Sequence, residues 1–304
     1  NNIVLISSQL ILTKMKSLIT SKQVSIIIPA FNEENSIYEV VNKLTYKLPE
    51  AEIIVIDDGS TDKTYDRIKN LNIKIIQHPL CLGYGTSLRS GIEVATKNYV
   101  LFCDADGQHR IRDVVALIDN IGKYDMTVGY RRKDSHQQLN RLLGKSIFKW
   151  FSNLIIGEKV RDINSGLRII KKSKIKKYLH LMPHGFSFST TCTFAFLKDN
   201  RSINWVPIIT KKRNGVSSVR QFKDGPSALL QLIRLSILFE PLRIFLFSST
   251  SLLLLAFISF LVNIYLEQAL NVTDTTVILA LGSLIVFLSG LLCEQVSGLR
   301  RDVK

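Results

Sequence analysis

Several patterns that would assign this chain to a common class of protein are missing from its sequence. The four cysteines lie far apart with no CxxC spacing, so we expect reduced, structural cysteines in a cytosolic body. There is no nucleic-acid-binding motif and no basic stretch studded with aromatic residues, which argues against nucleic acid as a partner. A dinucleotide-binding fingerprint is also absent. The Gly-Tyr-Gly at residues 83–85 has no third glycine at the required spacing and follows the third expected strand, so we interpret it as a tight turn.

A cleavable signal peptide is not evident either. Residues 3–12 are too short and too polar to span a membrane, and we expect residues 1–22 to form an N-terminal arm that is mobile or lies on a membrane surface.

What the sequence does have is positive charge. The net charge is +15, and all of it precedes residue 244, where 37 Lys and Arg stand against 21 Asp and Glu. A basic body joined to an apolar tail indicates an anionic membrane surface or phosphate-bearing substrates. Residues 131–177 hold fourteen Lys and Arg against three Asp and Glu, which is either a solvated face or a surface for a substrate with several phosphates.

Short apolar runs alternate with helical segments in the first part of the chain. We expect strands at residues 24–28 (a run that Pro29 ends), 52–56, 73–77, 99–103 and 125–129, and two more at 167–170 and 203–207. Because the links between them are short, this alternation predicts an α/β fold with a doubly wound, mostly parallel sheet.

The tail differs in character from the rest. Residues 226–243 are expected to form a juxtamembrane amphipathic helix lying in the membrane surface. Residues 244–304 contain two apolar runs, 244–265 and 276–293, and at about 1.5 Å per residue both can cross a hydrocarbon core of about 30 Å. Their link carries no cation and both outer flanks do, which predicts a cytoplasmic large domain and a cytoplasmic C-terminus. A buried helical hairpin in a soluble protein is the alternative.

Two acidic motifs follow expected strands. Asp104 and Asp106 come after an apolar run, with Gln108 two residues further on. Carboxylate and amide oxygens are hard ligands of the kind that hold Mg²⁺ or Mn²⁺ against a diphosphate. The other interpretation is an Asp-rich turn stabilised by side-chain-to-backbone hydrogen bonds. Asp57, at the end of an earlier strand, is consistent with helix capping or with binding a nucleobase or ribose.

Four segments carry a resemblance to a known family: IPAFNEE at 28–34, DDGSTD at 57–62, DADGQH at 104–109 and DINSGLR at 162–168. In this order they resemble family-2 glycosyltransferases of the GT-A fold. Within that family, the chain looks like the dolichyl-phosphate mannose synthase and polyprenyl-phosphate hexosyltransferase branch. We therefore expect a GT-A glycosyltransferase domain at residues 23–225, and the two-span tail is similar to that of many bacterial members.

The resemblance implies inverting transfer of a single hexose from a nucleotide-sugar, of the GDP-mannose or UDP-glucose type, to a polyprenyl or dolichyl phosphate. It also implies a divalent cation, Mg²⁺ or Mn²⁺. Carried over by position, the side chains implied to line the nucleotide are Pro29, Phe31, Glu33 and Asp57. Those implied to engage the metal and the donor diphosphate are Asp104, Asp106 and Gln108. Those implied to face the acceptor phosphate or the diphosphate are Arg131 and Arg168, with Arg141 and Ser146 as further candidates.

The chemistry of such a reaction agrees with another absence. The acceptor oxygen is already anionic, so no strong general base is needed and no Ser-His-Asp or Cys-His set is required. Catalysis would rest on in-line positioning, with metal and arginine stabilising the departing diphosphate. We expect His109 to be a structural neighbour of the metal motif. The loop at residues 78–83 departs from relatives, which often carry Asn there, so no donor contact is carried over to it.

Two other functions are left open by the sequence. A processive polysaccharide synthase of the same superfamily would carry Gln-x-x-Arg-Trp, but residues 231–235 lack the Trp and two spans are few for a polymer channel. A catalytically idle membrane scaffold is the second, against which the intact acidic motif argues. The expected partners are the nucleotide-sugar, the lipid phosphate and the bilayer, and the paired tail helices are compatible with a homo-oligomer.

Overall fold

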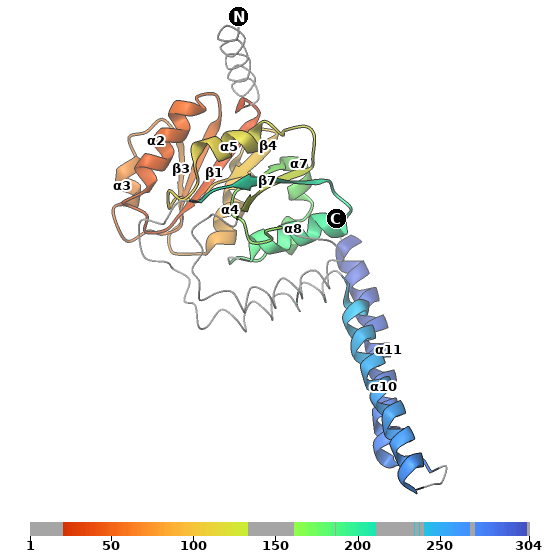
Figure 1. The fold of residues 1–304 in the computed structure, drawn as a ribbon. Coiled ribbons are helices and arrows are strands. Elements are labelled where there is room, and N and C mark those ends of the chain that lie inside the picture. The colour runs from red at the N-terminus through yellow and green to blue at the C-terminus, as the bar shows by residue number, and fades with distance from the viewer. Residues whose placement is uncertain are drawn as a thin grey trace, which may run out of the picture. The chain divides into compact units, whose positions relative to one another are not determined.

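The computed structural model describes residues 21–132, 161–185, 187–210, 234, 237, 240–267 and 271–302. Contacts divide the chain into an α/β unit and a unit that contains a helical hairpin. In the α/β unit, seven strands form one sheet in the order β3-β2-β1-β4-β6-β5-β7 (Figure 1). The strands are β1 (Val24–Ala30), β2 (Glu52–Asp57), β3 (Lys74–Gln77), β4 (Tyr99–Phe102), β5 (Met126–Arg131), β6 (Arg168–Lys171) and β7 (Ile203–Ile208).

Helices pack on both faces of this sheet. They are α2 (Ile37–Lys47), α3 (Thr64–Ile68), α4 (Tyr84–Val94), α5 (Ile111–Ile118), α7 (Lys172–Lys176) and α8 (Phe188–Lys198), with a 3₁₀ turn at Leu179–Leu181. Alternate residues of β1, including Ile26 and Ile28, join a buried cluster with α2, α3 and α5. On the opposite face Gly91 of α4 lies against Ile27, and Phe188 of α8 packs edge-on against Phe102 at 5.9 Å between ring centroids. Both faces of the central strands are therefore buried, which explains their continuous apolar runs.

The strand order brings the functional segments to one edge. Strands β1, β2 and β4 are parallel, and the order reverses between β1 and β4, which is where open α/β sheets bind ligands. Strand β6 is antiparallel to β4 and to β5, with Arg168 paired to Phe102. The segment before β6 therefore meets the carboxyl ends of β4 and β5.

The first strand is longer than expected. Residue Pro29 does not end it, because β1 continues to Ala30 and pairs Pro29 with Ile56 of β2. Pairing of β1 with β4 stops at Ile27, and Cys103 N donates to the Ile27 carbonyl at 3.1 Å. No strand partner is left on that side at the proline, so its missing N–H costs no ladder hydrogen bond.

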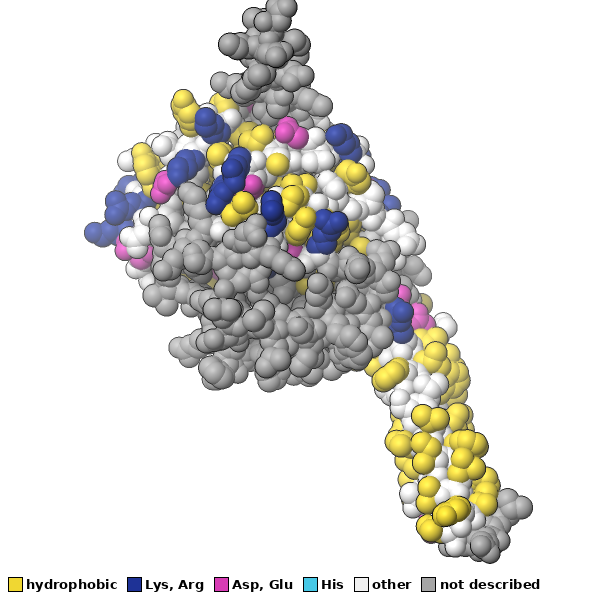
Figure 2. Space-filling view, in the orientation of Figure 1, with side chains coloured by type: hydrophobic (Ala, Val, Ile, Leu, Met, Phe, Trp, Pro, Cys, Tyr) yellow, Lys and Arg dark blue, Asp and Glu magenta, His cyan; other side chains and the backbone are white. Residues whose placement is uncertain are grey.

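The hairpin consists of α10 (Pro241–Glu267) and α11 (Asp274–Asp302), which contain the two expected spans and extend beyond them. Their apolar windows, Pro241–Leu266 and Asp274–Leu299, have mean hydropathies of 2.3 and 2.5 and are long enough to cross a membrane. Figure 2 shows apolar side chains along the visible length of the hairpin, and exposed ones include Leu254, Phe257, Ile285 and Leu292. Proline suits the first turn of a helix, where Pro241 lies. Most of the expected juxtamembrane helix, like residues 1–20, lies outside the described residues.

Polar groups between the two helices find partners within the hairpin. Ser283 Oγ donates to the Ser249 carbonyl at 2.8 Å, and Asn263 Nδ2 donates to the Asn271 carbonyl at 2.7 Å. Hydrogen bonds of this kind hold helices together where water is excluded. The two helices also approach closely at Gly290, where a Cβ atom would lie 2.5 Å from Phe245 Cβ.

We predict that Gly290→Ala loosens the hairpin, because the added methyl group must displace Phe245. Overpacking of this kind typically costs about 1–3 kcal/mol. The control is Gly282→Ala in the same helix, where nothing lies within 4 Å of the added atom. The measurement is thermal stability in detergent, with the folded protein that remains after heating detected by gel filtration. The stability of Gly290→Ala should fall, and that of Gly282→Ala should stay unchanged. Equal stability of both variants would contradict the close packing.

Candidate functional site

The loops that follow β1 and β2 are tied together by their own side chains. Asn32, which has a positive φ of 55°, accepts a hydrogen bond from Thr61 N at 2.8 Å. Glu33 N donates to Thr64 Oγ1 at 2.8 Å. Phe31 is 39% exposed between these anchored neighbours. The loops thus form a fixed edge with an accessible aromatic ring.

The two carboxylates at the end of β2 have different surroundings. Asp57 is 2% exposed and accepts hydrogen bonds from Ser60 N at 3.0 Å and Gln77 Nε2 at 3.3 Å. It stabilises the turn after β2 and does not cap α3, whose N-cap residue is Lys63. Asp58 accepts four hydrogen bonds, all from the loop after β3. Burial alone would raise the pKa of Asp58, but the bonds from His78 and from backbone N–H groups outweigh it and hold the pKa below its usual range.

Asp58 organises the loop at residues 78–83. The sequence left open whether this loop contacts the nucleotide-sugar donor. Its Oδ2 accepts from Gly83 N at 2.8 Å and its Oδ1 from Leu82 N at 3.0 Å. The loop also packs directly on the turn after β2, since a Cβ atom at Gly59 (φ 72°) would lie 2.5 Å from Leu80 C. Only glycine suits that position. One buried carboxylate therefore determines where the loop lies at this edge of the sheet.

Asp104 is held on several sides. Tyr84, the first residue of α4, donates to Oδ1 at 3.2 Å, and His109 Nε2 donates to Oδ2 at 3.3 Å. Beneath it, a Cβ atom at Gly166 would lie 2.6 Å from Oδ2. Burial raises the pKa of Asp104, but the hydrogen bonds from His109 and Tyr84 and the charges of His109 and Arg131 outweigh it, so the pKa lies below its usual value. The carboxylate is thus ionised and fixed in orientation, with 33% of its side chain still exposed.

Asp106 and Gln108 form the outer part of the motif. Both are half-buried, and Gln108 N donates to Asp106 Oδ1 at 3.0 Å in a tight turn. The turn expected from the Asp-rich sequence is therefore present, and a half-exposed carboxylate lies beside it. His109 is almost buried and donates to Asp104, which agrees with its expected role as a structural neighbour.

The donor set fits a hard divalent cation. Two carboxylates and one amide, two of them half-exposed, can supply oxygens to Mg²⁺ or Mn²⁺, and such ions keep waters and take the remaining ligands from substrate phosphates. Among the described residues there is no group of three or more His, Cys, Asp and Glu side chains that could enclose a metal by itself. The arrangement therefore suits an ion that is held jointly with a diphosphate.

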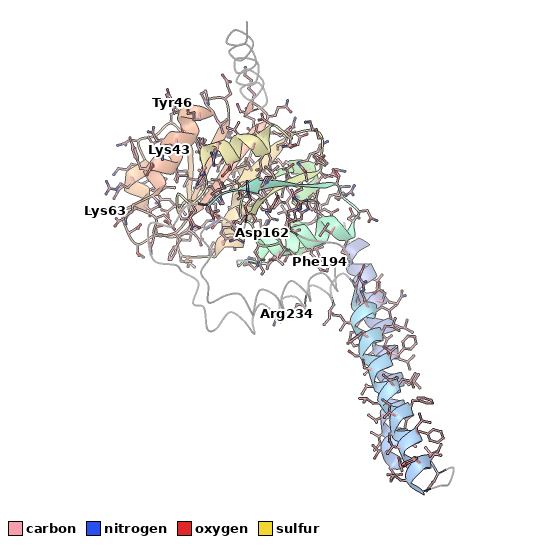
Figure 3. The ribbon with its side chains drawn as sticks, viewed as in Figure 1. Lys43, Tyr46, Lys63, Asp162, Phe194 and Arg234 are labelled. Atoms are coloured by element: carbon pink, nitrogen blue, oxygen red, sulfur yellow. The ribbon has the colours of Figure 1, made fainter. Side chains whose placement is uncertain are left out.

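Arg131, at the end of β5, makes a two-pronged ion pair with Asp162. Asp162, which Figure 3 labels, lies in the segment before β6. Its Nε lies 2.7 Å from Asp162 Oδ2 and its Nη2 2.9 Å from Oδ1. The hydrogen bond to Asp162 raises the pKa of Arg131. Burial would raise the pKa of the Asp162 carboxyl, but the hydrogen bond and the charge of Arg131 outweigh burial and lower that pKa. The Arg131 side chain is 44% exposed and its charge reaches Asp104. It is oriented by Asp162 and remains accessible to an anion.

Arg168 is placed differently from the expectation that it faces a phosphate. Its side chain is fully buried, with 0% exposed. Nη1 donates to the Ser189 carbonyl at 2.8 Å and to Thr193 Oγ1 at 3.0 Å, and Nε donates to the Ser165 carbonyl at 3.2 Å. The guanidinium is therefore occupied by main-chain and hydroxyl oxygens and does not line the site. Arg141 and Ser146 lie outside the described residues.

Sequence reasoning missed three residues that shape the site: Tyr84, Asp162 and Gly166. Each acts across a separation that no local pattern reveals, since Tyr84 is twenty residues from Asp104 and Asp162 is thirty-one from Arg131. Both Asp162 and Gly166 stand inside a segment that carried the family resemblance, which was the only available signal.

Two family models match this chain. A model for glycosyl transferase family 2 matches residues 25–187, more than half of the chain, and one for the GtrB C-terminal hairpin matches residues 240–299. The chain belongs to glycosyltransferase family 2. It is accordingly a glycosyltransferase, and its mostly parallel sheet followed by two apolar helices confirms the expected fold class.

Named relatives and solved structures agree with this membership. A UDP-N-acetylglucosamine–dolichyl-phosphate N-acetylglucosaminyltransferase of Methanococcus voltae is 34% identical over 51% of this chain and 72% of its own length. A dodecaprenyl-phosphate galacturonate synthase of Rhizobium johnstonii is 28% identical over 52% of this chain, which spans about half of that relative. Glucosyl-3-phosphoglycerate synthase of Mycobacterium tuberculosis, crystallised with Mn²⁺ and UDP, shares the fold with a TM-score of 0.57 at 17% identity over 70% of this chain and 78% of that chain.

We predict that Asp58→Asn destabilises the α/β unit. An amide has only one oxygen, so its NH₂ group would face a loop group that now donates to the carboxylate and would lose its acceptor. Leaving one buried donor unpaired costs about 1–3 kcal/mol. The measurement is denaturant unfolding of the purified chain, with Asp66→Asn as the same change in an exposed pair with Lys69. An unchanged midpoint for Asp58→Asn, as expected for the control, would show that the loop does not depend on this carboxylate.

Proposed function

We propose that the chain transfers a single hexose from a nucleotide-sugar to a polyprenyl or dolichyl phosphate, with inversion at the sugar and in a metal-dependent manner. The observation that carries this proposal is the edge of the sheet at which Asp104, Asp106 and Gln108 lie together with Arg131. This edge combines side-chain oxygens that can bind a metal ion with the accessible guanidinium of Arg131, in a chain that belongs to glycosyltransferase family 2. The names of two relatives, which contain a dolichyl or dodecaprenyl phosphate, support a lipid phosphate as the acceptor.

The donor side of the site has the shape and charge that a nucleotide diphosphate requires. The exposed Phe31 ring and the anchored loops after β1 and β2 offer a surface for the nucleoside. Pro29, Glu33 and Asp57 lie in or beside these loops, and we assign them to the same wall. A divalent cation held by Asp104, Asp106 and Gln108 would supply positive charge to the diphosphate oxygens.

The acceptor side needs orientation rather than proton transfer. A phosphate monoester oxygen is already a nucleophile, so the chain's task is to hold it in line with the sugar and to stabilise the departing diphosphate. Arg131 suits the second task, because Asp162 fixes its guanidinium and part of it remains exposed. Planar guanidinium groups bind phosphates through paired hydrogen bonds. The Asp162 pair therefore orients the cation before substrate arrives.

We place the reaction at the cytoplasmic face of the membrane. The two apolar helices are joined by a link without cations, and Arg243 and Arg301 lie on their outer flanks. By the positive-inside rule, the α/β unit and the C-terminus are then cytoplasmic. The expected domain boundaries at residues 22, 225 and 243, and a homo-oligomer, are part of the same proposal.

The reaction is tested with membranes that contain the chain and a panel of labelled sugar nucleotides. We expect one sugar nucleotide to give a labelled lipid that carries a single sugar, released by mild acid as expected for a sugar phosphodiester. A ladder of longer glycans would instead support the processive synthase. No labelled lipid from any donor, with metal present, would contradict the proposed transfer.

We predict that Asp106→Asn lowers transfer by about a hundredfold or more, because the cation that stabilises the departing diphosphate would lose an anionic ligand. Loss of one stabilising contact to developing negative charge typically costs about 10²–10³ in rate. The fold should be unchanged, since Asp106 is half-exposed. Circular dichroism and transfer rate are measured together, and Asp66→Asn, remote on α3, serves as the active control. Removal of divalent ions with a chelator should act on the wild type as the substitution does. Near-normal turnover of Asp106→Asn would remove it from the metal site.

A further inference from the structure

The fully buried guanidinium of Arg168 joins two segments that are far apart in sequence. Arg168 begins β6, and its hydrogen bonds go to Ser165 in the preceding turn and to Ser189 and Thr193 on α8. Nη2 also donates to the Ser165 carbonyl. No carboxylate is among these hydrogen-bond partners of Arg168. Burying a cation costs free energy unless its N–H groups are hydrogen-bonded. The N–H groups of Arg168 are bonded to the Ser165 turn and to α8, so the side chain holds these two segments together.

The turn that Arg168 holds is in direct contact with the acidic motif. Gly166 lies between Ser165, which accepts two bonds from the guanidinium, and β6. A Cβ atom at Gly166 would lie 2.6 Å from Asp104 Oδ2 and 3.0 Å from Oδ1. The turn therefore forms the floor beneath the Asp104 carboxylate, and a small displacement of the turn would move or release that carboxylate.

The second segment that Arg168 holds reaches Asp104 from another side. The Ser189 carbonyl accepts from Arg168, and the Ser189 side chain also hydrogen-bonds Tyr84, whose hydroxyl donates to Asp104 Oδ1. Burial and the charge of Asp104 hold the pKa of Tyr84 well above its usual range, so the hydroxyl stays a neutral donor. The turn that contacts Asp104 directly and helix α8, which is linked to Asp104 through Tyr84, are thus joined by one guanidinium.

We propose that Arg168 is a positioning residue of the sugar-transfer site, which acts on the metal and diphosphate site by holding the Ser165–Gly166 turn and the start of α8 around Asp104. This inference rests on the proposed function, because it assigns the diphosphate and its cation to Asp104. It differs from a phosphate-binding role for Arg168, which would require the guanidinium to be exposed. Partners that orient a metal ligand typically contribute 10–100-fold to metal affinity or activity.

The test compares three single variants and one double variant of the full chain in detergent, each checked for folding by circular dichroism and melting temperature. Arg168→Lys keeps the positive charge but cannot reach both segments with the planar fork of arginine. Gly166→Ala leaves Arg168 in place and pushes on Asp104 from below. Arg201→Met is the control, since this arginine binds Asp199 at the other end of α8. Binding of UDP and of GDP is measured by calorimetry with Mn²⁺ and with chelator, at a temperature well below melting.

We expect Arg168→Lys and Gly166→Ala each to weaken Mn²⁺-dependent diphosphate binding by about 10–100-fold, and the double variant to lose less than the product of the two because both act through Asp104. Arg201→Met should bind like the wild type. A purely structural role would lower the melting temperature of Arg168→Lys and leave its Mn²⁺-dependent affinity unchanged.

Two other results would overturn the inference. A wild-type Mn²⁺-dependent affinity for the diphosphate in folded Arg168→Lys and Gly166→Ala would show that Arg168 and the Ser165–Gly166 turn do not position the site. Unchanged diphosphate affinity with a raised KM for polyprenyl phosphate in Arg168→Lys would assign Arg168 to the acceptor instead. Failure of the wild type to bind either diphosphate with Mn²⁺ would contradict the proposed function itself, and with it any role for Arg168 in that site. If Arg168→Lys does not fold, Gly166→Ala alone decides, since it leaves the guanidinium network intact.

Discussion

The site depends on the ionised Asp104 carboxylate being held at the carboxyl edge of the sheet. A partly buried carboxylate is stable as an anion only when donors and cations compensate for its lost hydration. Here the compensation comes from Tyr84, His109 and the charge of Arg131, and the resulting pKa of Asp104 is lowered. His109 lies in the same loop as Asp104, but Tyr84 begins α4 and Arg131 ends β5, so these elements must be placed correctly before the carboxylate can be ionised and oriented. The ionisation of Asp104 therefore depends directly on how the fold packs.

Two arginines near this edge show how burial decides what a side chain does. Arg131 ends β5 and Arg168 begins the antiparallel β6, so both lie at the same edge of the sheet, and both stand in suggestive motifs. The first is 44% exposed and oriented by Asp162, whereas the second is fully buried and bonded to carbonyl oxygens. A phosphate can reach only the first. Residue type and motif do not distinguish them, because the difference arises from α8, which covers Arg168 and is distant in sequence.

Much of the fold could be predicted from local pattern. Every strand begins and ends within two residues of its expected position, because buried parallel strands are continuous apolar runs bounded by turn residues. The two tail helices were equally clear from length and composition. Two features were not predicted. Helix α5 was not expected at all, and β1 runs through Pro29 because β4 ends before the proline needs a partner, which is a property of the neighbouring strand.

The sequence by itself determined the chemistry: carboxylates and an amide after β4, cations after β5, and an apolar tail, together with the family to which these motifs belong. Only the tertiary structure decided which of those groups meet. Strand β6 runs antiparallel between β4 and β5 and so carries its preceding turn back to the same edge, where Gly166 contacts Asp104 and Asp162 pairs with Arg131. The physical reason is that strand direction and order are set by packing of the whole sheet. Asp162 is 31 residues from Arg131 in sequence, and Gly166 is still farther from Asp104. The turn therefore gives no local sign of the carboxylate or the arginine that it will contact.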